Sequence, residues 1–229
     1  MTPAVQKILL AAIAAQAPPA GAAWFESARA RLAVEPLAAL LECYSNAARK
    51  IGSGRLTLDA AGLACLADEA AGVDFSNWTT ADAARAVLLA DWRARVGADD
   101  RFVADASECF EQGDAGEQQS WLRALGLWPE AAAFLPAAIE TCRTNIIPVF
   151  EALACENPYP ARHFPERNFN QMVLKALFNG IAISRIVGRA GRLNAELSRM
   201  ARDYAAERTA AGRPVPADID LAIADQGRR

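Results

Sequence analysis

The sequence of 229 residues is poor in the side chains that most catalytic and metal sites need. It has one histidine, His163, and its five cysteines include no C-x-x-C pair, so we expect no metal site and a reducing compartment. It contains no phosphate-binding loop, dinucleotide fingerprint, nucleophile elbow or H-E-x-x-H motif. We therefore expect no cofactor, and residue chemistry alone assigns no reaction.

The sequence also lacks a strong charge and a long apolar run. Its net charge is −3 and 22% of its residues are charged, which argues against nucleic-acid binding. No stretch reaches the ~18 to 20 apolar residues that a spanning helix needs. Lys7, the following ILLAAIAA and the Ala15-Gln16-Ala17 triplet imitate a secretory signal. We favour an amphipathic helix in a cytoplasmic, non-transmembrane protein, because the apolar residues from Val5 to Ile13 follow helical spacing.

Alanine and leucine dominate, and apolar residues recur three and four positions apart, which predicts an all-α fold. The segment at 18–21 is expected to break the chain. Helices are expected at about 5–13, 37–51, 59–71, 80–96 with Thr80 or Asp82 as cap, 99–110 capped by Asp99, 114–125 opened by Asp114 and Glu117, and from Pro136. Short connections indicate antiparallel helix pairs, arranged as an irregular HEAT-like α-α superhelix or a compact multi-helix bundle in one domain, 1–229.

Charge is distributed unevenly along the chain. Residues 1–142 carry a net charge of −7, whereas residues 143–229 carry +4. The basic C-terminal part is suited to hold an anion or an acidic partner. The alternative is an ordinary solvated, arginine-rich helix face.

Polar residues gather after Arg143. Asn145 is expected to cap a helix that tolerates Pro148 in its first turn and carries Glu151 beside its inward face. The segment ENPYPARHFPER is predicted to form a stiff extended loop that fixes Tyr159 and His163.

Two long helices are predicted beyond that segment. The helix at 168–188 is apolar around most of its circumference, with one polar seam. The seam consists of Asn168, Gln171, Lys175 and Asn179. It either faces water or lines a groove in which Lys175 meets a ligand. The last helix, 191–211, is expected to carry a surface ladder of charges from Glu196 to Asp203.

Catalytic interpretations find little support in these residues. Cys155 with His163 and Asn157 offers a nucleophile and base, and His163 with Glu151 offers a general base. The acidic pair at 99–100 lacks the third acid that a magnesium–diphosphate site needs. A structural role is the favoured interpretation in each case.

The run RTNIIPVFEALACENPYPARHFPERNFNQMVLKALF, continued by RIVGRAGRLNAELSRMARDYAAERTAAGRPV, resembles the EboA family. The resemblance is dense over 122–215 and weaker over 1–113. Two departures concern packing: Phe169 stands where the family is expected to have tryptophan, and the terminal DIDLAIAD lacks another.

The resemblance implies a setting rather than a reaction. Family members look like components of a bacterial gene cluster that makes or moves a small-metabolite precursor towards the periplasm. Expected partners are a small metabolite or proteins of that cluster, including a UbiA-like membrane prenyltransferase. The resemblance brings no established catalytic residue. The candidate residues for binding a ligand or partner are Arg143, Asn145, Glu151, Asn157, Tyr159, His163, Asn170, Gln171, Lys175, Arg192, Asn194 and Arg208.

The leading hypothesis is a non-enzymatic helical module that binds a metabolite or a pathway partner. One alternative is a pathway enzyme that acts on a small anionic or prenylated substrate. The other is an adaptor for the prenyltransferase.

Overall fold

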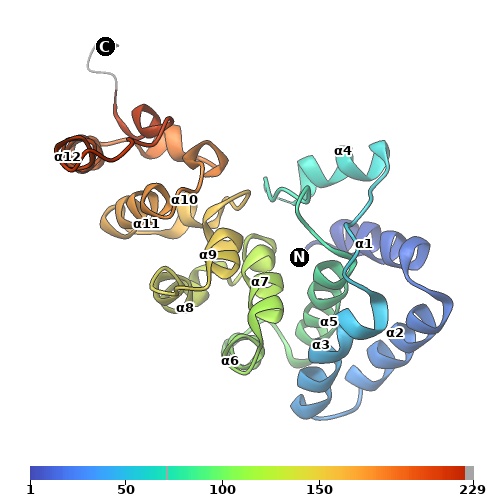
Figure 1. Cartoon of the computed structure of the whole chain (residues 1–229). Helices are drawn as coiled ribbons and strands as arrows, with labels where there is room; N and C mark the ends of the chain where they lie inside the picture. The colour runs from blue at the N-terminus through green and yellow to red at the C-terminus, as the bar shows by residue number, and fades with distance from the viewer. Residues whose placement is uncertain (71, 225–229) are drawn as a thin grey trace.

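The computed structural model describes residues 1–70 and 72–224 (Figure 1). The chain is 71% helical, and the described residues form 12 α-helices and no strand. The predicted all-α fold is confirmed. Within the same residues, no helix is long and apolar enough to cross a membrane.

The first five helices form one group, in which three helices pack against α5 and α4 packs against α1. They are α1 (Pro3–Gln16), α2 (Pro19–Leu32), α3 (Leu37–Ile51), α4 (Ala60–Glu69) and α5 (Thr80–Val96). Helices α1, α2 and α3 all pack against α5, most of whose residues are buried. Small alanine side chains on α5 let these neighbours approach closely.

The later helices follow one another away from that group (Figure 1). They are α6 (Asp100–Glu111), α7 (Ala115–Ala124), α8 (Leu135–Thr141), α9 (Ile147–Ala154), α10 (Tyr159–His163), α11 (Glu166–Phe178) and α12 (Ala195–Ala210). Helix α7 joins the two parts, because it packs against α5 on one side and α9 on the other. Contacts then run from α9 to α11 and from α11 to α12. The fold is thus bundle-like around α5 and stacked in chain order beyond α7.

Most predicted helix boundaries coincide with local capping signals. Asp99 and Asp114 each accept a backbone N–H in the first turn of α6 and α7, as expected. Asp59, expected only at the start of its helix, does the same for α4. Gly97 ends α5 with a φ of 96°, and Pro136 lies in the first turn of α8. These boundaries depend on residues within one turn, which is why sequence alone locates them.

Two predicted caps are wrong. Thr79, rather than Thr80 or Asp82, caps α5, and Asp82 supplies the second half of a capping box. Helix α9 begins after Ile146 without a side-chain cap, so Asn145 does not cap it. Asn145 is exposed.

The predicted break at 18–21 is too wide. Only the residues between α1 and α2 interrupt the helices, and Pro19 begins α2, because a first-turn proline lacks an N–H that would be unpaired anyway. The helix expected at 59–71 corresponds to α4, and its expected end at Ala71 lies outside the described residues.

The helix predicted at 168–188 ends ten residues early. The N–H of Ile181 donates to Ala176 O at 2.9 Å, and that of Gly180 donates to Leu177 O at 3.2 Å. This Schellman pattern needs a left-handed residue after the helix, and Gly180 supplies it with a φ of 71°.

Two other C-terminal predictions need correction. The proline-rich segment forms the single-turn α10 instead of an extended loop, with a proline in its first turn. The last helix starts at Ala195 rather than at 191, because Asn194 accepts the N–H of Leu197 and caps it. The segment Arg189–Arg192 before that cap is a 3-10 turn.

Candidate functional site

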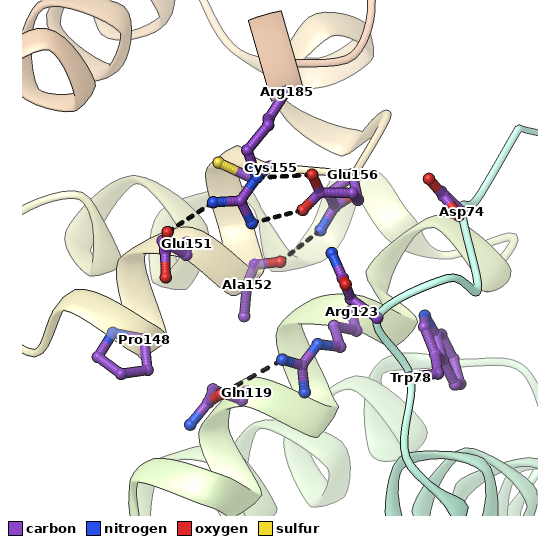
Figure 2. A pocket seen from close by; sticks show the side chains of 12 residues that line it. Asp74, Trp78, Gln119, Arg123, Pro148, Glu151, Ala152, Cys155, Glu156 and Arg185 are labelled. Carbon is purple, nitrogen blue, oxygen red and sulfur yellow. Dashed lines mark hydrogen bonds and ion pairs between the residues drawn. The ribbon is translucent and has the colours of Figure 1, made fainter. Parts of the chain in front are cut away.

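A polar recess of about 200 Å³ lies where α7, α9 and the segment before α5 meet (Figure 2). Its lining comes from four separate parts of the chain. The lining residues are Asp74, Asn77, Trp78, Gln119, Arg123, Pro148, Glu151, Ala152, Cys155, Glu156, Asn157 and Arg185. The recess contains both positively and negatively charged side chains, so it can donate hydrogen bonds to a small polar molecule and accept hydrogen bonds from it.

Arg185 bridges two carboxylates at one side of the recess. Its Nη1 lies 2.7 Å from Glu151 Oε1, and its Nε lies 2.7 Å from Glu156 Oε1. A third hydrogen bond runs from Nη2 to Glu156 Oε2 at 2.9 Å. The hydrogen bonds to Glu156 raise the pKa of Arg185 above its ordinary value, and Glu151 adds to the effect. This bidentate contact fixes the plane of the guanidinium.

Glu156 has a left-handed backbone conformation, with a φ of 52°. Among the described residues it is the one non-glycine with positive φ, a conformation that costs a residue of this kind about 1–3 kcal/mol. Its N–H donates to Arg185 O at 3.0 Å, so backbone and side chain both bind the same arginine. The fold therefore holds Glu156 in a strained conformation that directs its carboxylate to Arg185.

Arg123 forms the opposite wall of the recess, and Asp82 and Gln119 fix its guanidinium group. Its Nη1 lies 3.0 Å from Asp82 Oδ2, and its Nη2 donates to Gln119 Oε1 at 3.3 Å. Asp82 is 2% exposed and also accepts hydrogen bonds from Thr79 and Ser120. A buried carboxylate of α5 thus positions a cation at the recess.

The same polar network continues into the core through Arg85. Its Nε donates to Tyr44 O at 3.0 Å, and its Nη1 donates to Ser120 Oγ at 2.9 Å. Glu117 lies on its other side, with 3.8 Å between Arg85 Nη2 and Glu117 Oε1. Helices α3, α5 and α7 are therefore joined by hydrogen bonds as well as apolar contacts directly behind the recess.

A sequence model described as "metabolite traffic protein EboA" matches residues 5–224. The chain belongs to the EboA family. No curated protein and no solved structure matches it. The match extends over the N-terminal helices, where the sequence resemblance is weaker.

Of the twelve candidate residues of this EboA family member, Glu151 and Asn157 line the recess. Asn157 is 3% exposed, and its Nδ2 donates to Leu122 O at 2.9 Å and Ala152 O at 3.1 Å. Its Oδ1 accepts the N–H of Tyr159. All of these atoms are used to hold the turn between α9 and α10.

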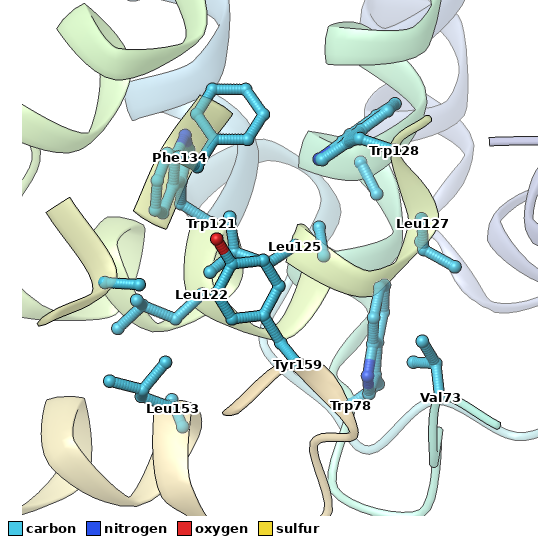
Figure 3. Close-up of a cluster of buried hydrophobic side chains, with 14 of the residues drawn as sticks. Val73, Trp78, Trp121, Leu122, Leu125, Leu127, Trp128, Phe134, Leu153 and Tyr159 are labelled. Atoms are coloured by element: carbon cyan, nitrogen blue, oxygen red, sulfur yellow. The ribbon is translucent and has the colours of Figure 1, made fainter. Parts of the chain in front are cut away.

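Tyr159 and His163 lie beside the recess rather than in it. Tyr159 is fully buried in a cluster of apolar side chains, and its hydroxyl donates to Ala131 O at 2.8 Å (Figure 3). Burial raises the pKa of Tyr159. His163 packs on the Tyr159 ring at 4.6 Å between ring centroids. Burial, with a smaller effect of Arg162, lowers the pKa of His163.

Lys175 joins α11 to the end of α8. Its Nζ donates to Cys142 O and Thr144 O, each at 2.6 Å, and lies 5.2 Å from the centroid of the Phe150 ring. These carbonyls follow the last turn of α8, where a cation is favourable. Gln171, on the same seam, is exposed to solvent.

Arg192 and the two remaining asparagines hold α12 in place. Arg192 donates to Ala161 O at 2.6 Å and Phe164 O at 2.7 Å. The side-chain amides of Asn170 and Asn194 donate to each other at 3.1 and 3.0 Å. These contacts connect α10 and α11 to the start of α12.

The remaining candidates lie apart from the recess. The Arg143 side chain is 76% exposed and pairs with Glu140. Arg208 donates to Pro214 O at 2.9 Å and lines a different groove near the C-terminal end. The structure therefore does not bring the twelve residues together around one cavity, and their role in ligand binding stays a prediction.

The catalytic alternatives lack the required contacts. Burial raises the pKa of Cys155 to about 12, which opposes formation of a nucleophilic thiolate. In the part of the chain that the structure describes, no hydrogen bond joins Glu151 to His163, and Glu151 pairs with Arg185 instead. Asp99 is the cap of α6.

Several residues of the recess were not identified from the sequence. Asp74, Arg123 and Arg185 come from distant segments and lie in no recognisable motif. Asp82 and Arg85, which lie behind the recess, could have been recognised in the sequence, because they lie three residues apart on a helix otherwise rich in alanine and leucine. That spacing predicts two charges on one helix face.

Proposed function

We propose that this EboA family member is a non-enzymatic accessory module that binds a small polar metabolite in the recess. Its proposed setting is the cytoplasm, where it assists movement of a metabolite precursor towards the periplasm. The description of the family as metabolite traffic proteins supports a metabolite-related role. Proteins of the same gene cluster, including a UbiA-like prenyltransferase, are its proposed partners.

The observation that carries the proposal is the arrangement of Arg185, Glu151 and Glu156. Glu156 retains an unfavourable backbone conformation while its side chain accepts two hydrogen bonds from Arg185 at one side of a polar recess. Strained backbone of this kind is concentrated at sites where a fixed side-chain geometry serves function. The Arg185–Glu156 pair is partly buried and bidentate, so it offsets part of the strain, and we take the fixed guanidinium at the recess as the functional reason for keeping the rest.

The composition of the recess supports a polar ligand. Asp74 also lines it, and one oxygen of its carboxylate accepts the N–H of Ser76 at 2.8 Å. With Arg123 on the opposite wall, a ligand would meet carboxylates and guanidinium groups across a short distance. A molecule with several donors and acceptors could satisfy both, and the small volume limits its size.

The test is an Arg185→Met variant expressed in cells that carry the complete gene cluster. We expect the amount of precursor or product reaching the periplasm to fall at least fivefold, because the recess loses its fixed guanidinium. Arg199→Met is the matched control, since Arg199 also bridges two carboxylates but on the exposed face of α12. Thermal unfolding of both variants establishes that they are folded. A folded Arg185→Met protein with wild-type output would contradict the proposal.

A further inference from the structure

A second cavity lies on the opposite side of the fold from α12, between α1 and α4. Its volume is about 740 Å³, within the range typical of small-molecule sites. Its lining is mainly apolar, and alanine is the commonest residue in it. The lining residues are Ala4, Lys7, Ile8, Ala11, Ala12, Ala15, Gln16, Thr57, Leu58, Asp59, Ala61, Gly62 and Cys65. We refer to this cavity as the α1–α4 groove.

The α1–α4 groove exists because α1 uses its two faces differently. Val5, Leu9 and Ile13 are buried in the core, whereas Ala11 and Ala15 on the other face are exposed. Short side chains on that face leave space under α4. Gly62 brings α4 near α1, since a Cβ there would lie 3.4 Å from Ile8 Cγ2.

Helix α4 is weakly anchored over this space. Leu66 is its one buried residue, although most of the helix is apolar, and Leu63 is 52% exposed. Another apolar cavity, distinct from the α1–α4 groove and about 420 Å³ in volume, lies against the same helix and is lined in part by Leu63 and Leu66. A helix with so few buried side chains can shift at low cost to admit a ligand.

The polar groups of the groove indicate which ligand it fits. Gln16 is occupied, because its side chain exchanges two hydrogen bonds of 2.8 Å with the backbone of Thr57. One oxygen of the Asp59 carboxylate, Oδ1, accepts the N–H of Gly62 at 2.7 Å and so caps α4. Lys7 is exposed, and among the described residues it forms no salt bridge. The groove therefore carries one ammonium group, Lys7, without a salt bridge to the described residues, and one carboxylate, Asp59, that serves as a helix cap.

The Gln16–Thr57 bridge also limits the length of an occupant. It joins the end of α1 to the segment before α4, so one end of the groove is closed. From Lys7 to Gln16 the helix rises about 14 Å, at 1.5 Å per residue. A short amphipathic molecule matches this length, whereas a helix from a partner would have to run past the closed end.

From this geometry we infer that the α1–α4 groove binds a small amphipathic acid, with its acidic group at Lys7 and its apolar body extending towards Gln16. Burial of the apolar body against alanine and leucine supplies the affinity. Lys7 favours an acid over an amine, because the one carboxylate of the lining, Asp59, is engaged at the positive N-terminal end of α4. This site is separate from the recess and does not depend on the function proposed for it.

Cys65 provides a local readout because its thiol lines the groove. The other four cysteines serve as internal references, since burial raises the pKa of each of those thiols and slows alkylation. The probes are dodecanoate and dodecylammonium, which share an apolar chain and differ in the sign of their charge. Iodoacetamide labelling of the full chain is followed by peptide mass spectrometry.

We expect dodecanoate to slow alkylation of Cys65 at least fivefold, and dodecylammonium to have little effect at the same concentration. Lys7→Glu should weaken dodecanoate binding about tenfold, which corresponds to about 1.4 kcal/mol. Lys50→Glu is the control, because Lys50 is an exposed lysine on α3.

A second pair of variants tests the location by shape. Ala11→Trp should fill the groove and abolish protection of Cys65, whereas Ala14→Trp, at an exposed position of α1 outside the lining, should not. Equal protection of Cys65 by dodecanoate and dodecylammonium would overturn the inference. Equal binding of dodecanoate by both tryptophan variants would also overturn it. So would protection by an amphipathic helical peptide without protection by dodecanoate. Arg185→Met should leave this binding unchanged, which separates failure of the groove from failure of the recess.

Discussion

Arg123→Met tests whether the wall of the recess depends on the buried carboxylate behind it. The substitution keeps much of the apolar volume of the side chain but removes the cation 3.0 Å from Asp82 Oδ2. Asp82 is 2% exposed, so its carboxylate would lose its partner in a medium that solvates it poorly. The hydrogen bonds from Thr79 and Ser120 would remain.

The expected loss of stability follows from the burial of the pair. Removing one partner of a fully buried pair costs about 3–5 kcal/mol. The Arg123 side chain is 21% exposed, and Asp82 keeps its other donors, so we expect about 2–3 kcal/mol. Arg199→Met, which breaks an exposed ladder, should cost no more than about 0.5 kcal/mol.

Urea unfolding followed by circular dichroism measures both variants. A double-mutant cycle with Asp82→Asn isolates the interaction, and we expect a coupling energy of about 1–3 kcal/mol. The double variant should therefore be more stable than the two single losses predict together. A loss below about 1 kcal/mol for Arg123→Met, or no coupling, would refute the argument that Asp82 positions Arg123.

Three other substitutions test structural roles. Tyr159→Phe should lower the free energy of unfolding by about 1–2 kcal/mol, because the buried Ala131 carbonyl loses its donor; an unchanged urea midpoint would contradict this. Lys175→Met should lower the free energy of unfolding by about 1–3 kcal/mol, since two carbonyls after α8 lose the same ammonium group. Gln171→Ala, at an exposed position of the same helix, is the control, and an equally small change for Lys175→Met would show that the contacts add no stability. The folded-state pKa of His163 is lowered, so the unfolded state binds the proton more readily and stability should decrease as pH falls through about 6.5. His163→Gln should reduce this decrease in urea midpoint between pH 7.5 and 5.5, and an identical slope would argue against it.

The fold was predictable where the deciding signal is local. Asp59, Asp99 and Asp114 begin helices through contacts within one turn. The sequence predicts Asp99 and Asp114 as capping residues and Asp59 as the start of a helix. The end of α11 was missed because Ile181 and Ile183 continue the apolar pattern beyond it. Only the hydrogen bonds around Gly180 show that those isoleucines pack from a turn rather than from a helix.

The candidate site was less predictable, because a capping side chain and a ligand-binding side chain look alike in sequence. Asn157, Lys175 and Asn194 are polar residues in an apolar region, and the structure shows each bound to backbone atoms. The recess instead depends on the long-range approach of Arg185 to α9. The left-handed conformation of Glu156 could not be predicted from its residue type, because glutamate rarely adopts a positive φ.

Native mass spectrometry of protein purified from cells with the complete gene cluster tests the central claim most directly. The account predicts that the wild-type protein and Arg199→Met carry a small polar molecule that dissociates on activation, and that Arg185→Met does not. Wild-type protein without a bound small molecule, or equal occupancy in Arg185→Met, would contradict the assignment of the recess as a metabolite site.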